Sequence, residues 1–254
     1  MIHASDVVKR FGNGEKSLTA LDGISIDISE GEFVSLLGPS GCGKSTFLRC
    51  LAGIETASSG TLLIDGRPVD GPPDRLGMAF QRDALLDWFD VLENVLLPAD
   101  FSGKRKRDHE LRARELLAMV GLGGFVNAYP RALSGGMRQR VAMCRSLLLD
   151  PRLLLMDEPF GALDALTRDQ LNVDLHHLSQ QRKMTAVFVT HSISEAVFLS
   201  TRVIVFSPRP GRVVEDISID LPRERRLAVR ESPEFLGYTR HIRGLFEKMG
   251  LIHD

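Results

Sequence analysis

The N-terminal part of the chain alternates apolar and polar side chains, a pattern typical of half-buried β-strands. The alternation covers Ile2–Phe11 and Leu21–Ile28, with a glycine-containing turn between them. Three shorter runs are almost entirely apolar and indicate strands buried on both faces: Phe33–Leu37, Leu153–Met156 and Ala186–Val189. Because helices separate these short strands, they predict an α/β core with a parallel sheet covered on both faces.

The middle of the chain, residues 83–149, has little strand character. Arg105–Val120 carries leucines among charged residues at the spacing of an amphipathic helix. Ser134–Leu149 has the same helical spacing, and Ser134 is a good N-cap residue. We therefore expect a helical subdomain inserted into the α/β core.

The C-terminal stretch alternates again over Pro208–Pro222, which predicts a hairpin or edge strands. Arg240–Met249 is interpreted as a last short helix.

Composition narrows the classes of function. The 254 residues contain 32 Lys and Arg against 33 Asp and Glu, so a dominant basic field for nucleic-acid binding is absent. Three cysteines without a CxxC pair exclude a disulfide framework and favour a reducing compartment. No apolar run approaches the ~20 residues of a membrane span, and the N-terminal segment lacks the features of a secretion signal.

A glycine-rich segment follows the apolar run Phe33–Leu37 and fits the phosphate-loop pattern G-x-x-x-x-G-K-[ST]. Glycines let consecutive backbone N–H groups point at phosphate oxygens, and the following helix adds the positive end of its dipole. Lys44 is predicted to reach the β- and γ-phosphates, Ser45 to bind Mg²⁺, and Thr46 to face the α-phosphate. The alternative is a glycine-rich turn with an exposed lysine. The segment consists of Gly38, Pro39, Ser40, Gly41, Cys42, Gly43, Lys44, Ser45 and Thr46.

Two adjacent acids end the apolar run Leu153–Met156. Asp157 at the strand end is predicted to hold Mg²⁺. The strand pleat directs the neighbouring Glu158 to the other side of the backbone, where it is predicted to accept a proton from an attacking water. The alternative is an acidic turn at a strand end.

A second candidate anion site lies at the start of the helix predicted from Ser134. It combines a serine hydroxyl with two glycine amides: Ser134, Gly135 and Gly136. Taken alone, this segment can also be explained as an ordinary helix N-cap that follows a flexible stretch of backbone.

Together these segments resemble the nucleotide-binding subunits of ATP-binding-cassette (ABC) transporters over nearly the whole chain. Leu133-Ser134-Gly135-Gly136 matches the family's signature, residues 38–46 its Walker A and residues 153–159 its Walker B. Gln81 matches the Q-loop, Gly161-Ala162-Leu163-Asp164 the D-loop and His191 the switch histidine. The resemblance implies an α/β P-loop NTPase core with an N-terminal antiparallel β subdomain and an inserted helical subdomain.

The resemblance also implies roles for individual residues. Glu158 would be the general base, while His191 would contact the γ-phosphate and order the water. Gln81 would join Mg²⁺ and link the site to the membrane partner, and Phe11 would stack on adenine. In a homodimer, Ser134 and Gly136 of one subunit would bind the γ-phosphate held by Lys44 of the other.

The subdomain bounds implied by the resemblance divide a single domain, 1–254. A RecA-like core covers about 1–82 and 150–206, the helical subdomain about 83–149, and a β/helix extension about 207–254. A GTPase is disfavoured, because no [NT]-K-x-D motif is present. A soluble ABC ATPase of DNA repair or cluster assembly remains a lesser alternative.

Further stretches are similar to the nitrate/sulfonate/taurine importer branch: residues 81–88, 160–168 and 207–214. The branch implies a peripheral ATPase at the cytoplasmic face of the membrane, working with permease subunits and, indirectly, a solute-binding protein. Import of a thiamine-precursor pyrimidine or another small organic solute is the alternative, because the cargo does not contact this subunit. ATP and Mg²⁺ are the expected ligands, and no nucleic-acid partner is expected.

Overall fold

The computed structural model describes residues 1–12, 17–103, 107–161, 163–181 and 184–252. They form two compact units, one of Met1–Asp74 with Lys183–Asp254 and one of Arg75–Arg182.

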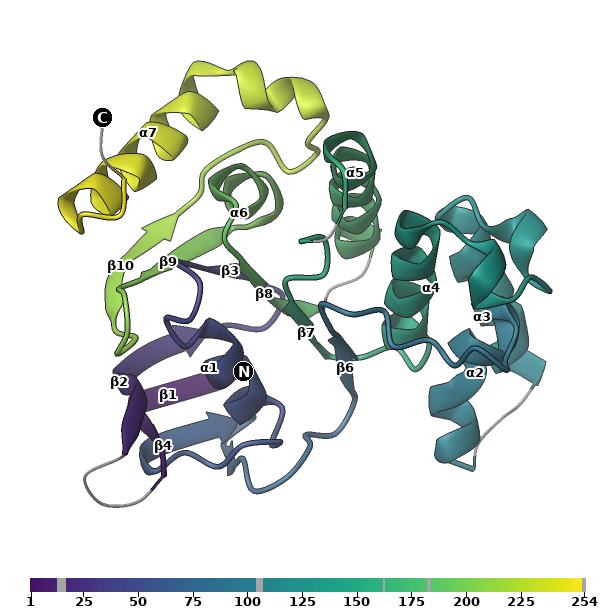
Figure 1. The fold of residues 1–254 in the computed structure, drawn as a ribbon, viewed down its shortest axis with the longest axis horizontal. Helices are drawn as coiled ribbons and strands as arrows, with labels where there is room; N and C mark the ends of the chain where they lie inside the picture. The colour runs from purple at the N-terminus through teal and green to yellow at the C-terminus, as the bar shows by residue number, and fades with distance from the viewer. Residues whose placement is uncertain (13–16, 104–106, 162, 182–183, 253–254) are drawn as a thin grey trace. The chain divides into compact units, whose positions relative to one another are not determined.

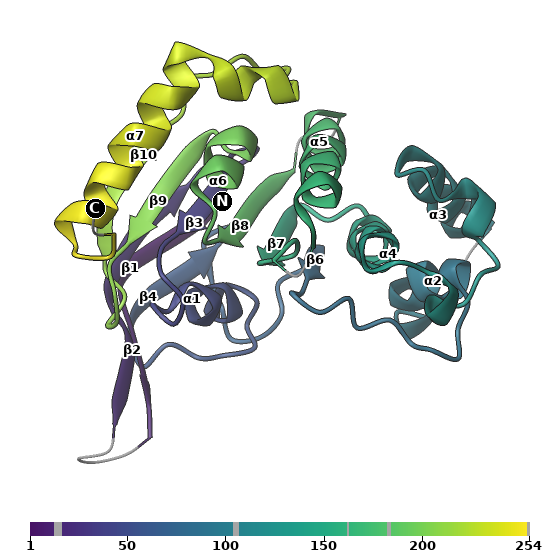
Figure 2. The same cartoon turned by 45° about the horizontal axis from the view of Figure 1, so that its top comes forward.

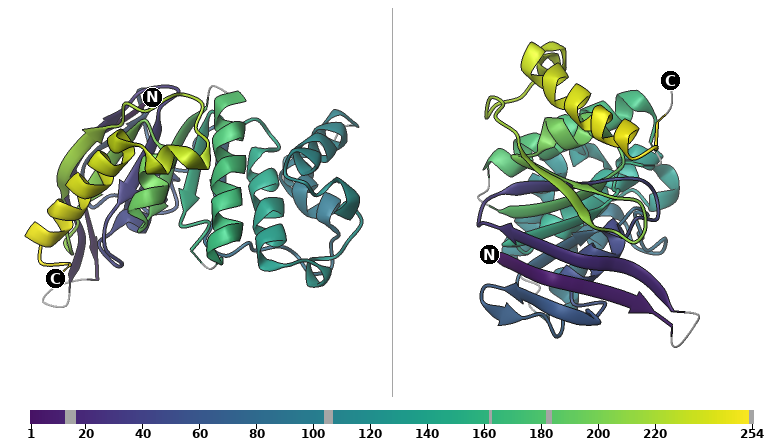
Figure 3. Two further views of the ribbon diagram at one scale, coloured as in Figure 1. Left: turned by 90° about the horizontal axis from the view of Figure 1, so that it is seen from above. Right: turned by 90° about the vertical axis from the view of Figure 1, so that its left-hand side faces the viewer.

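The first unit begins with an antiparallel sheet in the order β2-β1-β4-β5. Its strands are β1 (Ile2–Phe11), β2 (Leu18–Ile28), β4 (Ser59–Ile64) and β5 (Arg67–Pro68). The two longest strands, β1 and β2, lie side by side with Ile2 opposite Ile28 (Figure 3). The prediction of β1 is confirmed, β2 begins earlier than Leu21, and residues 13–16 of the expected turn lie outside the described residues.

A second group of strands in this unit has the order β10-β9-β3-β8. They are β3 (Phe33–Leu37), β8 (Thr185–Thr190), β9 (Arg202–Phe206) and β10 (Val213–Ser218). β3 is parallel to β8 and β9, whereas β10 pairs antiparallel with β9 at the edge. Every residue of β3 and β8 is buried, which explains their predominantly apolar sequences. Within Pro208–Pro222, the edge-strand alternative is therefore confirmed.

Three α-helices complete the first unit: α1 (Lys44–Leu51), α6 (Ile193–Leu199) and α7 (Pro233–Lys248). α1 and α6 lie on opposite faces of the β3–β8 strands, and α7 packs on α6 after the 3-10 turn η4 (Leu227–Glu231) (Figure 1). The predicted helix Arg240–Met249 was placed too late. Ser232 caps α7 by accepting a hydrogen bond from the Phe235 amide, and Pro233 occupies the first turn, where proline is tolerated.

The second unit contains the parallel pair β6 (Leu76–Ala79) and β7 (Leu153–Asp157) with a group of helices. The helices are α2 (Val91–Phe101), α3 (Arg107–Met119), α4 (Gly135–Leu147) and α5 (Ala165–Gln181), with 3-10 turns η2 (Gly123–Phe125) and η3 (Pro130–Ala132). α4 packs against α2, α3 and α5 (Figure 2). None of the described residues between positions 83 and 149 lies in a strand, as expected.

The two predicted helices of this unit are confirmed with small shifts of their ends. α3 begins at Arg107, and residues 105–106 of the expected helix lie outside the described residues. α4 begins directly after Ser134, whose hydroxyl accepts a hydrogen bond from the Met137 amide at 3.3 Å. The prediction of Ser134 as the N-cap is therefore correct.

Candidate functional site

The glycine-rich segment of the first unit joins the buried strand β3 to the N-terminus of α1, as the phosphate-loop pattern requires. Gly41 and Gly43 have φ angles of 75° and 106°, which glycine adopts without strain. A Cβ atom on Gly43 would lie 2.6 Å from the carbonyl oxygen of Ala20. The loop is thus held close to β2 by a contact that only glycine allows.

Lys44 directs its ammonium group back into this loop. Its Nζ donates hydrogen bonds to the carbonyls of Gly38 at 2.7 Å and Pro39 at 2.9 Å, and the residue is 3% exposed. The N-terminus of α1 carries no side-chain cap and no acidic residue in its first turn. A buried cation beside an uncapped helix N-terminus favours an anionic ligand.

Gly211 supports the loop from the C-terminal part of the chain, and sequence reasoning gave it no role. Its N–H donates to Ala20 and its carbonyl accepts from Asp22, at 2.9 and 3.0 Å. A Cβ atom here would lie 2.2 Å from the Cys42 carbonyl oxygen. The Pro210-Gly211 dipeptide, a turn signal, was the available hint.

Replacing Gly211 by alanine is expected to displace the Cys42 carbonyl, costing about 1–3 kcal/mol of stability as overpacking does and weakening ATP binding. Thermal unfolding and ATP titration measure the two effects. Gly237→Ala is the matched control, because its added methyl meets no atom within 4 Å on helix α7. If Gly211→Ala bound ATP like the wild type, the loop would not depend on this contact.

His191 follows β8 in the first unit and is exposed. Its neighbours are fixed: the Ser192 N–H donates to the Thr190 hydroxyl at 3.0 Å, and that hydroxyl donates to Glu195 at 2.6 Å. The structure therefore presents His191 to solvent from an anchored backbone.

Phe11 ends β1 with its ring 38% exposed. The Lys9 ammonium lies 4.8 Å from the ring centroid, a cation–π contact that holds the ring. An exposed, oriented ring is suited to stacking on a flat ligand.

In the second unit, Gln81 and Glu158 lie around Gly161. A Cβ atom on Gly161 would be 3.8 Å from both the Gln81 Nε2 and a Glu158 carboxylate oxygen. Asp157 ends β7, and Glu158 follows it with a φ of 45°, uncommon for a residue with a side chain. Two predicted site residues are thus brought together. The strand pleat was predicted to direct Glu158 away from Asp157, but this was wrong, because the strand ends at Asp157 and Glu158 has a left-handed backbone conformation.

The signature segment of this unit is packed against the start of α5. A Cβ atom on Gly136 would lie 2.4 Å from the Thr167 methyl carbon, so a larger residue here would force Thr167 to move. Thr167 in turn donates from its amide and hydroxyl to Asp164, which lowers the pKa of that carboxyl group. Ser134 and Gly135 stay exposed at the helix N-terminus, whereas Ala162 of the D-loop match lies outside the described residues.

Side chains of α4 also hold the segment around Gln81, a function that the helical pattern alone did not reveal. Gln139 donates to the carbonyl of Phe80 at 3.2 Å. Arg138 pairs with the Asp83 carboxylate at 2.9 Å, and Arg145 donates to the Asp83 carbonyl at 2.6 Å. Burial lowers the pKa of the Arg145 guanidinium without removing its charge at neutral pH.

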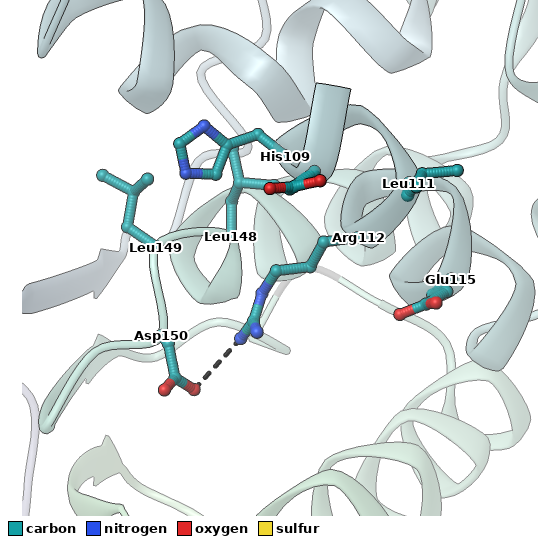
Figure 4. Close-up of a pocket in the computed structure, with 8 residues that line it drawn as sticks. His109, Leu111, Arg112, Glu115, Leu148, Leu149 and Asp150 are labelled. Atoms are coloured by element: carbon teal, nitrogen blue, oxygen red, sulfur yellow. Dashed lines mark hydrogen bonds and ion pairs between the residues drawn. The ribbon is translucent and has the colours of Figure 1, made fainter. Parts of the chain in front are cut away.

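A cavity of about 350 Å³ lies elsewhere in the second unit, where α3 meets the segment that follows α4 (Figure 4). Arg112 reaches across it to pair with Asp150 at 3.0 Å. None of the predicted site residues lines this cavity. Its lining is Asp108, His109, Leu111, Arg112, Glu115, Leu148, Leu149 and Asp150.

The strand–loop–helix unit with a buried lysine defines a P-loop nucleotide-binding protein. The chain matches the family described as ABC transporter over residues 21–161. The taurine import ATP-binding protein of Rhizobium johnstonii is 46% identical over 91% of this chain and 90% of that protein. The aliphatic sulfonates import ATP-binding protein of Bacillus cereus (strain ATCC 10987) is 39% identical over 97% of this chain and 96% of that protein.

A solved ATP-binding cassette, dimeric and bound to ADP and Pi after hydrolysis, is 34% identical and superimposes with a TM-score of 0.76. The match covers 87% of this chain and 100% of that one. The chain belongs to the ABC transporter family and is an ABC ATPase. The predicted family and fold class are both confirmed.

Proposed function

We propose that this chain hydrolyses ATP to drive the import of taurine or a related aliphatic sulfonate through separate permease subunits. The observation that carries the proposal is an intact phosphate loop, with Lys44 buried in it, in a chain similar over nearly its whole length to taurine and sulfonate import ATPases. The relatives' cargo supports the sulfonate class over nitrate or a thiamine-precursor pyrimidine.

The phosphate loop is proposed to bind the ATP phosphates through the backbone N–H groups of residues 38–43, except Pro39, which has none. Lys44 would exchange its bonds to the Gly38 and Pro39 carbonyls for bonds to the β- and γ-phosphates. Thr46 would face the α-phosphate and Phe11 would stack on adenine. The exposed ring of Phe11 and the uncapped α1 N-terminus support these roles.

Mg²⁺ is proposed to be held by Ser45, Gln81 and Asp157. Among the residues that the structure describes, no three His, Cys, Asp or Glu side chains gather as a metal site. That suits Mg²⁺, which typically binds one or two carboxylates together with substrate phosphates. The ion would neutralise charge on the phosphates, and Glu158 would accept the proton of the attacking water while His191 orders that water.

A homodimer is proposed to complete each site, with Ser134, Gly135 and Gly136 of one subunit binding the γ-phosphate on the other. The exposed serine and glycine at the α4 N-terminus and the dimeric state of the solved cassette support this arrangement.

Within the described residues, no helix has the length and apolar character needed to cross a bilayer. The chain would work at the cytoplasmic face on permease subunits, indirectly with a solute-binding protein.

Growth tests the cargo. A strain lacking the gene would carry the wild type, Glu158→Gln or the control Glu115→Gln, which removes an equally charged, exposed group on α3. With taurine or an alkanesulfonate as the sole sulfur source, we expect the wild type and Glu115→Gln to grow and Glu158→Gln to fail. All three should grow on sulfate. Growth of Glu158→Gln on every sulfonate, or failure on nitrate alone, would overturn the sulfonate assignment.

A further inference from the structure

The C-terminal extension places a buried arginine at the end of helix α6. Arg225 is 5% exposed, and one guanidinium nitrogen donates to three carbonyls: Val197 at 3.2 Å, Phe198 at 2.9 Å and Ser200 at 2.9 Å. Val197 and Phe198 belong to the last turn of α6, and Ser200 is its C-cap. Arg225 therefore caps this helix from a segment that lies after β10.

A cation is well suited to this position. The last carbonyls of a helix have no partner within it, and they form the negative end of the helix dipole. The Nε of Arg225 donates to the Pro222 carbonyl at 3.0 Å, so the guanidinium ties the extension to the helix. Burial lowers the pKa of Arg225, but an arginine remains charged at neutral pH.

The rest of the extension packs on the same helix. The Arg230 guanidinium lies 5.0 Å from the Phe198 ring centroid, and α7 packs against α6 (Figure 2). Tyr238 of α7 accepts a hydrogen bond from the Asp220 amide at 2.9 Å, which closes the extension on itself. α6 is thus held from its C-terminal end by residues 220–238.

The other end of α6 carries His191. Ser192 is the N-cap, and its side chain accepts a hydrogen bond from the Glu195 amide at 3.3 Å. The Glu195 carboxylate in turn accepts from Thr190, the residue before His191. His191 therefore lies between two residues that are both anchored to α6, and its position follows that of the helix.

We propose that Arg225 is a positioning residue for ATP hydrolysis: it fixes α6 and so sets the place of His191. The inference rests on the role proposed for His191 above. The hydrogen bonds that link Arg225 to α6 and to Pro222 all go to backbone carbonyls. Its effect on the reaction is therefore indirect, through the helix.

The test uses the transporter purified with its permease through a tag on this chain. Arg225→Met keeps an unbranched, mostly apolar stem but removes the donors. Arg225→Lys restores one nitrogen that can serve the three carbonyls. We expect kcat to fall about 10- to 100-fold in Arg225→Met, as small misplacements do, with the KM for ATP unchanged within about twofold. Arg225→Lys should recover most of kcat, and the exposed neighbour Arg226→Met should match the wild type.

A double-mutant comparison separates positioning from general destabilisation. In the His191→Ala background, Arg225→Met should lower kcat no further, because the two residues act through one group. If the two substitutions lowered kcat by factors that multiply, the inference would be overturned. A kcat in Arg225→Lys no higher than that in Arg225→Met would overturn it as well. Loss of ATP binding would show that Arg225→Met does not fold. In that case Arg225→Gln takes its place, with the same expected kcat and KM and the same double-mutant comparison.

The two proposals fail in different ways. A lowered kcat in His191→Ala beside a wild-type kcat in Arg225→Met would overturn the positioning role alone. A wild-type kcat in His191→Ala would overturn the proposed role of His191 and the inference with it.

Discussion

Replacing Glu158 by glutamine is expected to lower ATP turnover by about 10²- to 10⁴-fold, the usual contribution of a general base. An amide has the size of the carboxylate but does not take up a proton at neutral pH. ATP binding should persist, because the substitution leaves the phosphate loop and Lys44 unchanged. Steady-state hydrolysis by the purified transporter and ATP titration measure the two quantities.

Glu115→Gln is the matched control, since it makes the same chemical change on the exposed face of α3. Near wild-type hydrolysis in Glu158→Gln would exclude Glu158 as the base. The same variant tests the composite site, because slow hydrolysis should trap an ATP-bound dimer. Light scattering after gel filtration at saturating MgATP should then report a dimer, and a monomer would contradict completion of the site across the interface.

Lys44→Ala is expected to raise the Kd for ATP about 10- to 100-fold, the range given by losing a hydrogen bond from a charged donor. The substitution also leaves the Gly38 and Pro39 carbonyls, which Lys44 satisfies, without that partner. A modest loss of thermal stability without nucleotide should therefore accompany the weaker binding.

Arg49→Ala is the control for this prediction, because it removes an exposed positive charge from the same helix. Fluorescence titration with ATP compares the two variants with the wild type. Equal affinities in Lys44→Ala and Arg49→Ala would mean that the phosphates do not depend on the loop lysine.

The elements that could be predicted are those whose environment is uniform along their length. β3 is buried at every position, so its apolar run gave both ends correctly, and Ser134 carried a local capping signal. β4 was missed because most of its residues are only partly buried or exposed, which leaves a weak pattern. The start of α7 was missed although Ser232 and Pro233 form a start signal.

The candidate site divides in the same way. The phosphate loop and the two acids at the end of β7 are contiguous motifs, so they could be found without knowledge of the fold. Gly211 and Arg225 act on segments distant in sequence, Cys42 and the end of α6. No local sequence pattern marks such contacts, since these residues meet their partners only when the chain is folded.

The order of the strands has a consequence for synthesis on the ribosome. The second unit is one continuous segment, and the antiparallel sheet β2-β1-β4-β5 is complete by Pro68, so both can form as the chain emerges. β3 cannot pair at this stage, because its neighbour β8 is translated roughly 150 residues later. Pairing between strands so far apart in the sequence slows folding. The strand that leads into the phosphate loop, which is apolar at every position but Ser35, therefore waits unpaired in the nascent chain. An apolar strand without its partners is prone to aggregation, so this segment is one that a chaperone would protect.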